Sequence, residues 1–225
     1  MRGPRHSVSP SRVFIVDDHP MMRLGLGQFL TQDGDLCICG EAPDAAAALK
    51  GIERIRPDLV LLDITLEGRS GLDLLRDLRL RFPGIPVLVH SMHDEMIYAE
   101  RALAAGARGY LMKQETGEKV RVAVRQVLNG QTYLSDRLRA RAPARAAART
   151  SRRAGLTPIG SLSQREFEVF GLIGGGRTNQ EIADQLHISL KTVEAHREHI
   201  KRKLKLPSST ALNLLAVRWE SEQSA

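Results

Sequence analysis

The sequence of 225 residues has no long apolar run and no recognisable export signal. No segment approaches the roughly 18 consecutive apolar residues that a membrane-spanning helix needs. The opening stretch Met1–Pro10 also lacks the apolar core of a secretory signal peptide. These absences argue against a membrane protein and against a secreted one. We therefore expect a cytoplasmic protein without a membrane partner.

Cysteine is also scarce, since Cys37 and Cys39 are the only two in the chain. They stand two residues apart in a predicted strand, so their side chains should point to the same face. Two thiols are too few for a zinc site. We expect both to be buried as small apolar side chains.

Acidic and basic residues are distributed unevenly. Residues 12–129 carry 15 basic against 17 acidic residues, whereas residues 130–225 carry 16 basic against 9 acidic. The basic excess of the C-terminal part predicts a polyanionic partner for that part. With 42% hydrophobic residues, the chain is long enough to build two modest domains with cores of their own.

An apolar run, Leu59–Leu62, leads directly to Asp63. Its length and continuity indicate a strand buried on both faces, as in a parallel sheet covered by helices. Val13–Val16 leads in the same way to Asp17 and Asp18. Ligands of open parallel sheets collect beyond the carboxyl ends of the strands, so we expect three carboxylates at one rim. Such acids repel one another, and a hard cation such as Mg²⁺ would relieve the repulsion.

Two further apolar runs end in polar groups. Gly109–Lys113 has the pattern of a buried strand that ends in a cation suited to a phosphoryl group, and Val87–His90 ends at the hydroxyl of Ser91. Helical patterns, such as Ala45–Ile55, alternate with the strands as far as Asn129. This alternation predicts a parallel sheet with right-handed crossovers.

The acid pair, single acid, hydroxyl and lysine together resemble the receiver domain of bacterial response regulators. The resemblance implies a flavodoxin-like α/β domain with five parallel strands, in which a cognate sensor histidine kinase phosphorylates Asp63. It assigns Mg²⁺ binding to Asp17, Asp18, Asp63 and Thr65. It assigns the phosphate contact to Lys113 and the relay of the change to Ser91 and Tyr110. A carboxylate nucleophile needs the metal and the lysine because phosphoryl transfer depends mainly on positioning and charge neutralisation.

Some positions depart from the receiver pattern or tune it. Glu67 stands where receivers usually have a proline, and Arg69 is close enough in sequence to offset its charge. Thr65 and His93 fall where receivers place residues that tune hydrolysis of the phosphoryl group, in a direction that the pattern leaves open. His90 interrupts an aliphatic strand end. We expect a partly exposed or hydrogen-bonded histidine there rather than a proton shuttle.

The composition changes after the first domain, which we predict over residues 12–129 behind a flexible tail of residues 1–11. Residues 130–157 are rich in arginine and alanine and are predicted to be a linker. Its arginines either contact DNA phosphates or keep the tether solvated and extended. Leu134–Ala142 favours helix by composition, although Pro143 and the missing apolar periodicity argue against a packed element.

Four short helical patterns fill residues 158–223 and predict a small all-α domain. Ser163–Glu166 and Thr178–Glu181 each match a capping box, which marks the start of a helix. A third helix is predicted over Leu190–Leu204, after a short turn. Val193 and Ile200 belong to its apolar stripe.

The opposite face of this third helix is basic and mixed-polar. Such a helix suits the major groove of DNA, where side chains read base edges and cations meet phosphates. The residues expected to contact double-stranded DNA are Lys191, Thr192, Glu194, Ala195, Glu198, His199 and Arg202. The stretch T-N-Q-E-I-A-D-Q-L-H-I-S-L-K-T-V-E-A-H, preceded by S-L-S-Q-R-E-F-E-V-F, closely resembles the LuxR-type helix-turn-helix, with the motif at about 178–197. Together the two halves resemble a NarL-type response regulator.

A glycine-rich stretch, Gly171–Thr178, has the spacing of a phosphate-binding P-loop with Arg177 in place of the lysine. A P-loop follows a strand, whereas this stretch continues a helical pattern and ends it with glycines. Nucleotide binding is therefore rejected.

These patterns predict a regulator of transcription that is switched by phosphorylation, is not an enzyme, and forms a homodimer when active. Two alternatives remain. An aspartate-nucleophile phosphatase needs an aspartate as general acid two residues after the nucleophile, where Thr65 stands. A receiver that acts only through protein contacts would not need the helix-turn-helix.

Overall fold

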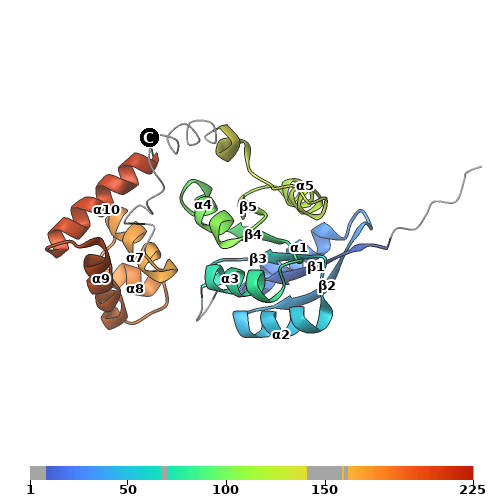
Figure 1. The fold of residues 1–225 in the computed structure, drawn as a ribbon, viewed down its shortest axis with the longest axis horizontal. Helices are drawn as coiled ribbons and strands as arrows, with labels where there is room; N and C mark the ends of the chain where they lie inside the picture. The colour runs from blue at the N-terminus through green and yellow to red at the C-terminus, as the bar shows by residue number, and fades with distance from the viewer. Residues whose placement is uncertain (1–8, 67–69, 141–158, 160–161, 225) are drawn as a thin grey trace, which may run out of the picture. The chain divides into compact units, whose positions relative to one another are not determined.

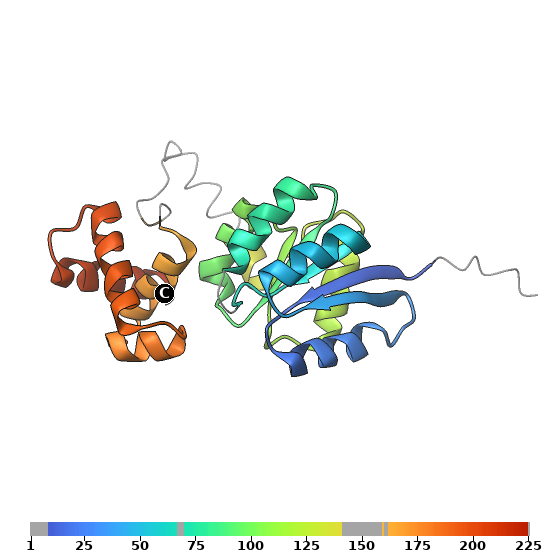
Figure 2. The same cartoon turned by 90° about the horizontal axis from the view of Figure 1, so that it is seen from below.

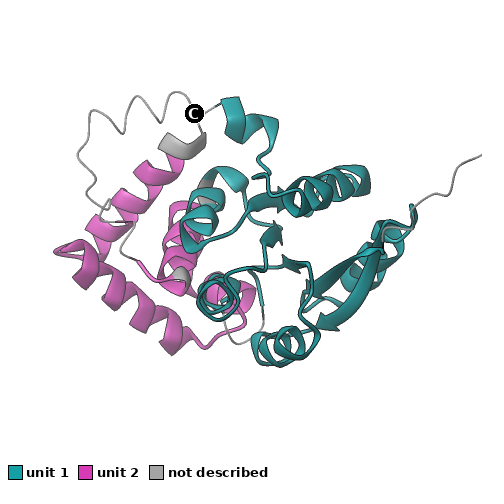
Figure 3. Ribbon diagram, turned by 45° about the vertical axis from the view of Figure 1, so that its right-hand side comes forward, with its two compact units in different colours: residues 1–143 teal, residues 144–225 magenta. Residues whose placement is uncertain are grey.

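The computed structural model describes residues 9–66, 70–140, 159 and 162–224. The chain divides into two compact units, Met1–Pro143 (unit 1) and Ala144–Ala225 (unit 2), which Figure 3 shows in different colours. Among the described residues, no helix combines the length and the hydropathy needed to cross a membrane.

Unit 1 contains a five-stranded parallel sheet with the strand order β2-β1-β3-β4-β5 (Figure 1). The strands are β1 (Ser11–Val16), β2 (Leu36–Ala42), β3 (Leu59–Leu62), β4 (Val87–Ser91) and β5 (Gly109–Met112). The helices between and after them are α1 (Pro20–Leu30), α2 (Ala45–Ile55), α3 (Gly71–Arg81), α4 (Glu95–Ala105) and α5 (Gly117–Leu128). The predicted flavodoxin-like α/β fold is confirmed.

Helices cover both faces of this sheet (Figure 2). On one face, apolar residues of all five strands, Leu61 among them, pack against α1 and α5 in one buried cluster. On the other face α2 lies against β1 and β2. The Phe14 ring fills the space there so closely that a Cβ on Gly40 or Gly51 would come within 2.5 or 2.7 Å of it. Apolar runs without alternation are what a sheet covered on both faces requires.

The sequence also supplies the helix starts. Asp44 and Asp94 cap α2 and α4, since each side chain accepts a hydrogen bond of 2.8 Å from a backbone N–H in the first turn. Pro20 is the first residue of α1, where its missing N–H costs nothing. Each of these helices therefore begins directly after a loop at the carboxyl end of a strand.

The edge strand β2 differs from the prediction in the burial of its cysteines. Cys37 and Cys39 are free and only half-buried, so the expected full burial was wrong. The reason is that β2 has a neighbouring strand on one side only. Cys39 is also an extra residue in the β1–β2 register, because Val13 pairs with Ile38 and the next residue of β1 already pairs with Gly40.

Unit 2 is helical, with α7 (Gln164–Gly174), α8 (Asn179–Gln185), α9 (Leu190–Leu204) and α10 (Ser209–Ser224). Both predicted capping boxes are present, at the starts of α7 and α8. Side chains from all four helices form a buried core, including Phe170, Ile182, Val193 and Leu212. The predicted all-α domain of four helices is confirmed.

Two tight turns shape this unit. Gly171 lies inside α7, and Gly176 follows its end with a φ of 76°, so the glycine-rich stretch continues a helix and not a strand. After α8, His187 adopts a left-handed conformation with a φ of 51°. The N–H of Ile188 then reaches back to the carbonyl of Ala183 at 3.0 Å and closes the helix. The second turn separates α8 from α9.

The first part of the predicted linker belongs to unit 1, since Tyr133 is buried in the apolar cluster and forms a bridge with Gly109. Residues 136–140 are helical, within the stretch where the composition favours helix. Residues 141–157 of the predicted linker lie outside the described residues. So do residues 1–8 of the predicted tail, whereas Ser11 already begins β1.

Candidate functional site

Charged side chains from three strand ends meet at the carboxyl edge of the sheet. Asp17 follows β1, Asp63 follows β3 and Lys113 follows β5. The Lys113 ammonium lies 2.7 Å from Asp17 Oδ2 and 2.7 Å from Asp63 Oδ2. All three side chains are at most 2% exposed. One ammonium therefore faces two buried carboxylates, which leaves this corner of the protein with an excess of negative charge.

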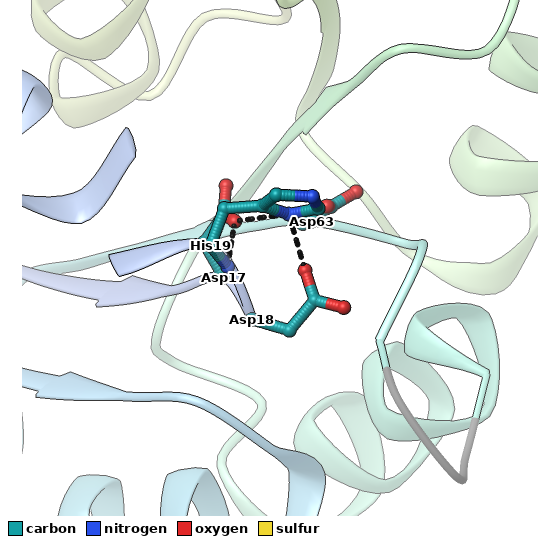
Figure 4. A group of neighbouring side chains, drawn as sticks. All are labelled: Asp17, Asp18, His19 and Asp63. Carbon is teal, nitrogen blue, oxygen red and sulfur yellow. Dashed lines mark hydrogen bonds and ion pairs between the residues drawn. The ribbon is translucent and has the colours of Figure 1, made fainter. Parts of the chain in front are cut away.

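Asp18 and His19 extend the group into an acidic cluster (Figure 4). One ligand atom from each of Asp17, Asp18, His19 and Asp63 lies within 4.8 Å of all the others. His19 Nδ1 is 2.6 Å from Asp18 Oδ1 and 3.4 Å from Asp17 Oδ1. His19 was not among the residues predicted for this site, and its place directly after the acid pair is the only sequence signal for it.

The oxygen atoms of this cluster fit a hard divalent cation. Thr65 Oγ1 is buried and has no hydrogen-bond partner among the described residues. The same holds for Asp18 Oδ1, whose close contact with His19 lacks hydrogen-bond geometry. Buried oxygens without a donor are costly unless something else satisfies them. Three carboxylates with free lone pairs are the ligands that such a cation prefers.

Burial sets the electrostatics of the aspartate at the centre. It raises the pKa of Asp63 to about 6, although the nearby charge of Lys113 and the hydrogen bond from the Thr65 N–H, 2.9 Å long, act to lower it. For Lys113 burial acts to lower the pKa, but the charges and hydrogen bonds of Asp63 and Asp17 outweigh it and the pKa is raised. The lysine thus stays charged beside a carboxylate that is costly to ionise without a further cation.

The raised pKa of Asp63 predicts how stability depends on pH in the metal-free protein. The pKa of Asp63 is 3.8 in the unfolded state and about 6 in the folded state. Between these two pH values the folded state binds more protons at Asp63 than the unfolded state does. The contribution of Asp63 to the free energy of unfolding therefore falls as the pH rises. Asp63→Asn removes this titration. From pH 4 to pH 7 we expect the free energy of unfolding of the variant, relative to wild type, to rise by about 2 kcal/mol.

Hydrogen exchange of the β3 amides in EDTA, corrected for intrinsic exchange rates, measures this difference for unit 1. A difference that stays constant between pH 4 and pH 7 would contradict the prediction. Asp73→Asn serves as the control, because the Asp73 side chain is 43% exposed, lies on α3 and pairs with Arg76.

The predicted relay residues, Ser91 and Tyr110, are both hydrogen-bonded to the backbone of His93. The Tyr110 hydroxyl donates to the carbonyl of His93 at 2.9 Å, and the N–H of His93 donates to Ser91 Oγ at 3.2 Å. Both relay side chains are fully buried, and burial raises the pKa of the Tyr110 hydroxyl. The His93 ring stacks on Tyr98 of α4 with the ring centroids 4.4 Å apart. The relay pair is thereby connected to the start of α4.

His90 differs from the prediction, which was a partly exposed or hydrogen-bonded side chain. It is fully buried, and its Nδ1 has no hydrogen-bond partner among the described residues. The reason is its place in β4, an inner strand of the sheet. Side chains two residues apart in a strand point to the same face, so His90 faces the same side as Leu88, which belongs to the buried cluster. Burial lowers the pKa of His90 to about 4, so the ring is neutral at pH 7. Glu67 and Arg69 lie outside the described residues.

In unit 2, α9 presents the residues predicted for DNA contact. Its apolar side is buried through Val193 and Ile200. Six of the seven predicted residues are exposed: Lys191, Glu194, Ala195, Glu198, His199 and Arg202. The seventh, Thr192, is half-buried, and its hydroxyl lies 2.7 Å from Ser189 Oγ at the start of the helix.

The exposed residues of α9 differ in their bonding. Glu198 pairs with Lys201 at 2.7 Å, and His199 Nδ1 lies 3.9 Å from Glu166 Oε1 of α7. Lys191 and Arg202 have no ion pair within the described residues, so their charges are available to a partner. Lys191 lies in the first turn of α9 and Arg202 in its last turn.

Comparisons with known proteins cover both units. Residues 13–125 match the family described as response regulator receiver domain, and residues 160–216 match the bacterial regulatory proteins of the luxR family. The oxygen regulatory protein NreC of Staphylococcus aureus (strain JH9) is 33% identical over 204 residues, which are 89% of this chain and 94% of NreC.

Solved structures give the same picture. A two-component response regulator of the LuxR family from Aurantimonas sp. SI85-9A1 is 28% identical with a TM-score of 0.58, over 62% of this chain and 99% of that one. RcsB of Salmonella enterica serovar Typhimurium, bound to promoter rprA with the phosphomimetic BeF3-, shares the fold with a TM-score of 0.60 at 23% identity, over 91% and 96% of the two chains. The predicted resemblance is confirmed. The chain belongs to the response regulators of the LuxR type, regulators of transcription that join a receiver domain to a DNA-binding helix-turn-helix domain.

Proposed function

We propose that Asp63 switches this response regulator by accepting a phosphoryl group from a sensor histidine kinase. The observation that carries the proposal is the buried contact of 2.7 Å between Asp63 and Lys113 inside the acidic cluster. A lysine held at this distance neutralises the oxygens of a phosphoryl group once it is attached to the aspartate. The carboxylate is otherwise an ordinary weak nucleophile that depends on its surroundings for activation.

In the transfer, an Asp63 oxygen forms a bond to phosphorus while the phosphorus–nitrogen bond of the kinase phosphohistidine breaks. The leaving imidazole nitrogen keeps the electron pair and takes up a proton. Asp17, Asp18 and Asp63, with Thr65, would hold Mg²⁺, which supplies charge neutralisation for the transferring group when bound. Within the chain, the N–H of Thr65 orients Asp63 through its 2.9 Å hydrogen bond to Oδ1.

The relay follows from the bonds that Ser91 and Tyr110 already make. A phosphoryl group on Asp63 offers new acceptor oxygens to Lys113 and to the Ser91 hydroxyl. Movement of Ser91 changes its bond to His93, and the bond between His93 and Tyr110 changes with it. The surface formed by β5 and α4 then favours a homodimer, in the sense of a population shift between two states.

The output is binding to double-stranded DNA by α9. Its support is the exposed face opposite Val193 and Ile200, which carries near both ends a cation with no ion pair among the described residues. This face inserts into the major groove, where Ala195 and Glu198 meet base edges and Lys191 and Arg202 meet phosphates. A homodimer would place two such helices on two half-sites. The DNA of a bacterial cell lies in its cytoplasm, and we place the protein there.

Replacing Lys191 and Arg202 together with alanine is expected to weaken binding to any duplex DNA. The logarithm of the DNA-binding constant falls linearly with the logarithm of the salt concentration, and the loss of two phosphate contacts should make this slope less steep by about 2. Fluorescence anisotropy with a labelled duplex of arbitrary sequence, at several salt concentrations, measures this slope. A double variant of Arg54 and Arg76, exposed cations of unit 1, removes the same charge and should leave the slope unchanged. Equal slopes for all three proteins would overturn the assignment of α9.

Phosphotransfer itself is tested by incubating the protein with Mg²⁺ and acetyl phosphate. Intact mass spectrometry should show a gain of one phosphoryl group, and peptide mapping should place it on Asp63. Repeated turnover of the phosphodonor without a retained phosphoryl group would support the phosphatase alternative instead. No mass gain under conditions that phosphorylate another receiver would contradict the proposal.

A further inference from the structure

We propose that His19 is a nitrogen ligand of the acidic cluster and that it makes this site prefer transition-metal ions to Mg²⁺. The inference rests on the proposed cation site formed by Asp17, Asp18 and Asp63. It adds a residue to that site and assigns it a role in choosing the metal.

The geometry of His19 is that of a ligand. Neighbouring ligand atoms around a divalent metal with bonds of about 2.1 Å lie about 3 Å apart. His19 Nδ1 lies 2.6 Å from an oxygen of Asp18 and 3.4 Å from an oxygen of Asp17, on either side of that value. Figure 4 shows the ring turned back over the acid pair and not away from it. A metal ion bound by the acids would therefore meet Nδ1 with little rearrangement.

Neither helix capping nor packing in the core explains the position of the ring. His19 is the N-cap of α1, but its side chain makes no capping hydrogen bond. The side chain is 69% exposed, so it does not belong to the core. The local backbone is held instead by the N–H of His19, which donates to Asp17 Oδ1 at 2.9 Å, and this bond does not depend on the ring.

The position of Lys113 leaves one side of Asp17 open to the metal and the ring. Lys113 contacts Oδ2 of Asp17, whereas His19 Nδ1 approaches Oδ1 of the same carboxylate. The two groups therefore use different oxygens. A cation on the His19 side can bind while the lysine stays in contact with the acids.

The chemistry of the donors sets the preference. Mg²⁺ is a hard ion that takes carboxylate oxygens and waters and gains little from an imidazole. Co²⁺, Ni²⁺ and Zn²⁺ bind imidazole well and stand higher in the general order of affinities. Three carboxylates alone bind any divalent ion, but three carboxylates with one imidazole favour the transition metals. His19 thus determines specificity between metals and leaves the binding of Mg²⁺ almost unaffected.

The experiment compares the full-length wild-type protein with His19→Ala, using Mg²⁺ and Co²⁺ as probes at one fixed pH. Isothermal titration calorimetry gives the two dissociation constants, and the visible absorption of bound Co²⁺ reports a nitrogen ligand. We expect His19→Ala to weaken Co²⁺ binding about tenfold and to change the Mg²⁺ dissociation constant by less than about twofold. The absorption spectrum of bound Co²⁺ should shift.

His187→Asn is the matched control, because it removes an exposed histidine from unit 2 at a left-handed position that asparagine tolerates. Its dissociation constants for Mg²⁺ and Co²⁺ should equal those of the wild type. Equal effects of His19→Ala on both metals, or no effect on Co²⁺, would overturn the role of His19. Failure of Mg²⁺ to bind the wild-type protein would instead count against the proposed cation site itself.

Discussion

Asp63→Asn is expected to abolish phosphorylation while unit 1 keeps its fold. The substitution removes the nucleophilic carboxylate and preserves the volume of the side chain. An asparagine oxygen can still accept the hydrogen bond that Thr65 donates at 2.9 Å. Lys113 keeps Asp17 as an ion-pair partner at 2.7 Å, so the buried ammonium is not left alone. The loss should be complete, because no other residue is proposed as the acceptor.

Mass spectrometry after incubation with Mg²⁺ and acetyl phosphate measures the effect. Wild type should gain one phosphoryl group and Asp63→Asn none. Asp73→Asn makes the same chemical change at a half-buried position of α3 and should be phosphorylated as wild type is. Equal labelling of Asp63→Asn and wild type would refute the assignment of the acceptor. Unchanged hydrogen exchange of the β3 amides at pH 4 would show that the loss is chemical and not a loss of fold.

Gly71→Ala is expected to cause the second large effect, on the backbone that positions Asp63. Gly71 is the buried first residue of α3, and its N–H donates to the carbonyl of Ile64 at 3.0 Å. A Cβ at this position would lie 2.5 Å from Ile64 Cα and would also collide with the carbonyl of Asp63. Both obstacles are backbone, which cannot rotate away as a side chain can. We expect a loss of about 3 kcal/mol in the free energy of unfolding of unit 1.

Hydrogen exchange of the β3 amides measures that loss, and acetyl phosphate labelling shows whether the displaced backbone also slows phosphorylation. Gly25→Ala is the control. Gly25 is an exposed residue of α1 with open space around its Cα, so alanine there should stabilise unit 1 by about 0.5 to 1 kcal/mol through helix propensity. Opposite signs for the two substitutions are the expected result. A neutral Gly71→Ala would mean that the Asp63–Gly71 backbone relaxes freely.

The fold was predictable because its signals are local. The run Leu59–Leu62 is apolar without alternation, and the structure places it as the buried strand β3. The capping boxes at Ser163 and Thr178 are read directly from residue types three positions apart, and α7 and α8 begin there. A parallel sheet then brings the ends of its strands to one edge, which is why Asp63 and Lys113 meet.

Most of what the sequence did not predict depends on neighbours far along the chain. Full burial of His90 follows from the helices over an inner strand, and a single sequence gives no measure of that cover. Cys37 and Cys39 were expected inside, but the strand order that makes β2 an edge is a property of the whole sheet. His19 belongs to the cluster only because its ring turns back toward the acids. The direction of a side chain is not encoded in the spacing of residues.

Both bonds that join Ser91 and Tyr110 to residue 93 go to backbone atoms, the N–H and the carbonyl. Every amino acid except proline offers these two groups, so the coupling between the relay residues does not depend on which side chain stands at position 93. The side chain at position 93 adds a separate link, because the His93 ring stacks on Tyr98 of α4. A substitution at His93 is therefore expected to alter the connection to α4 and to leave the two bonds between the relay residues and the backbone in place.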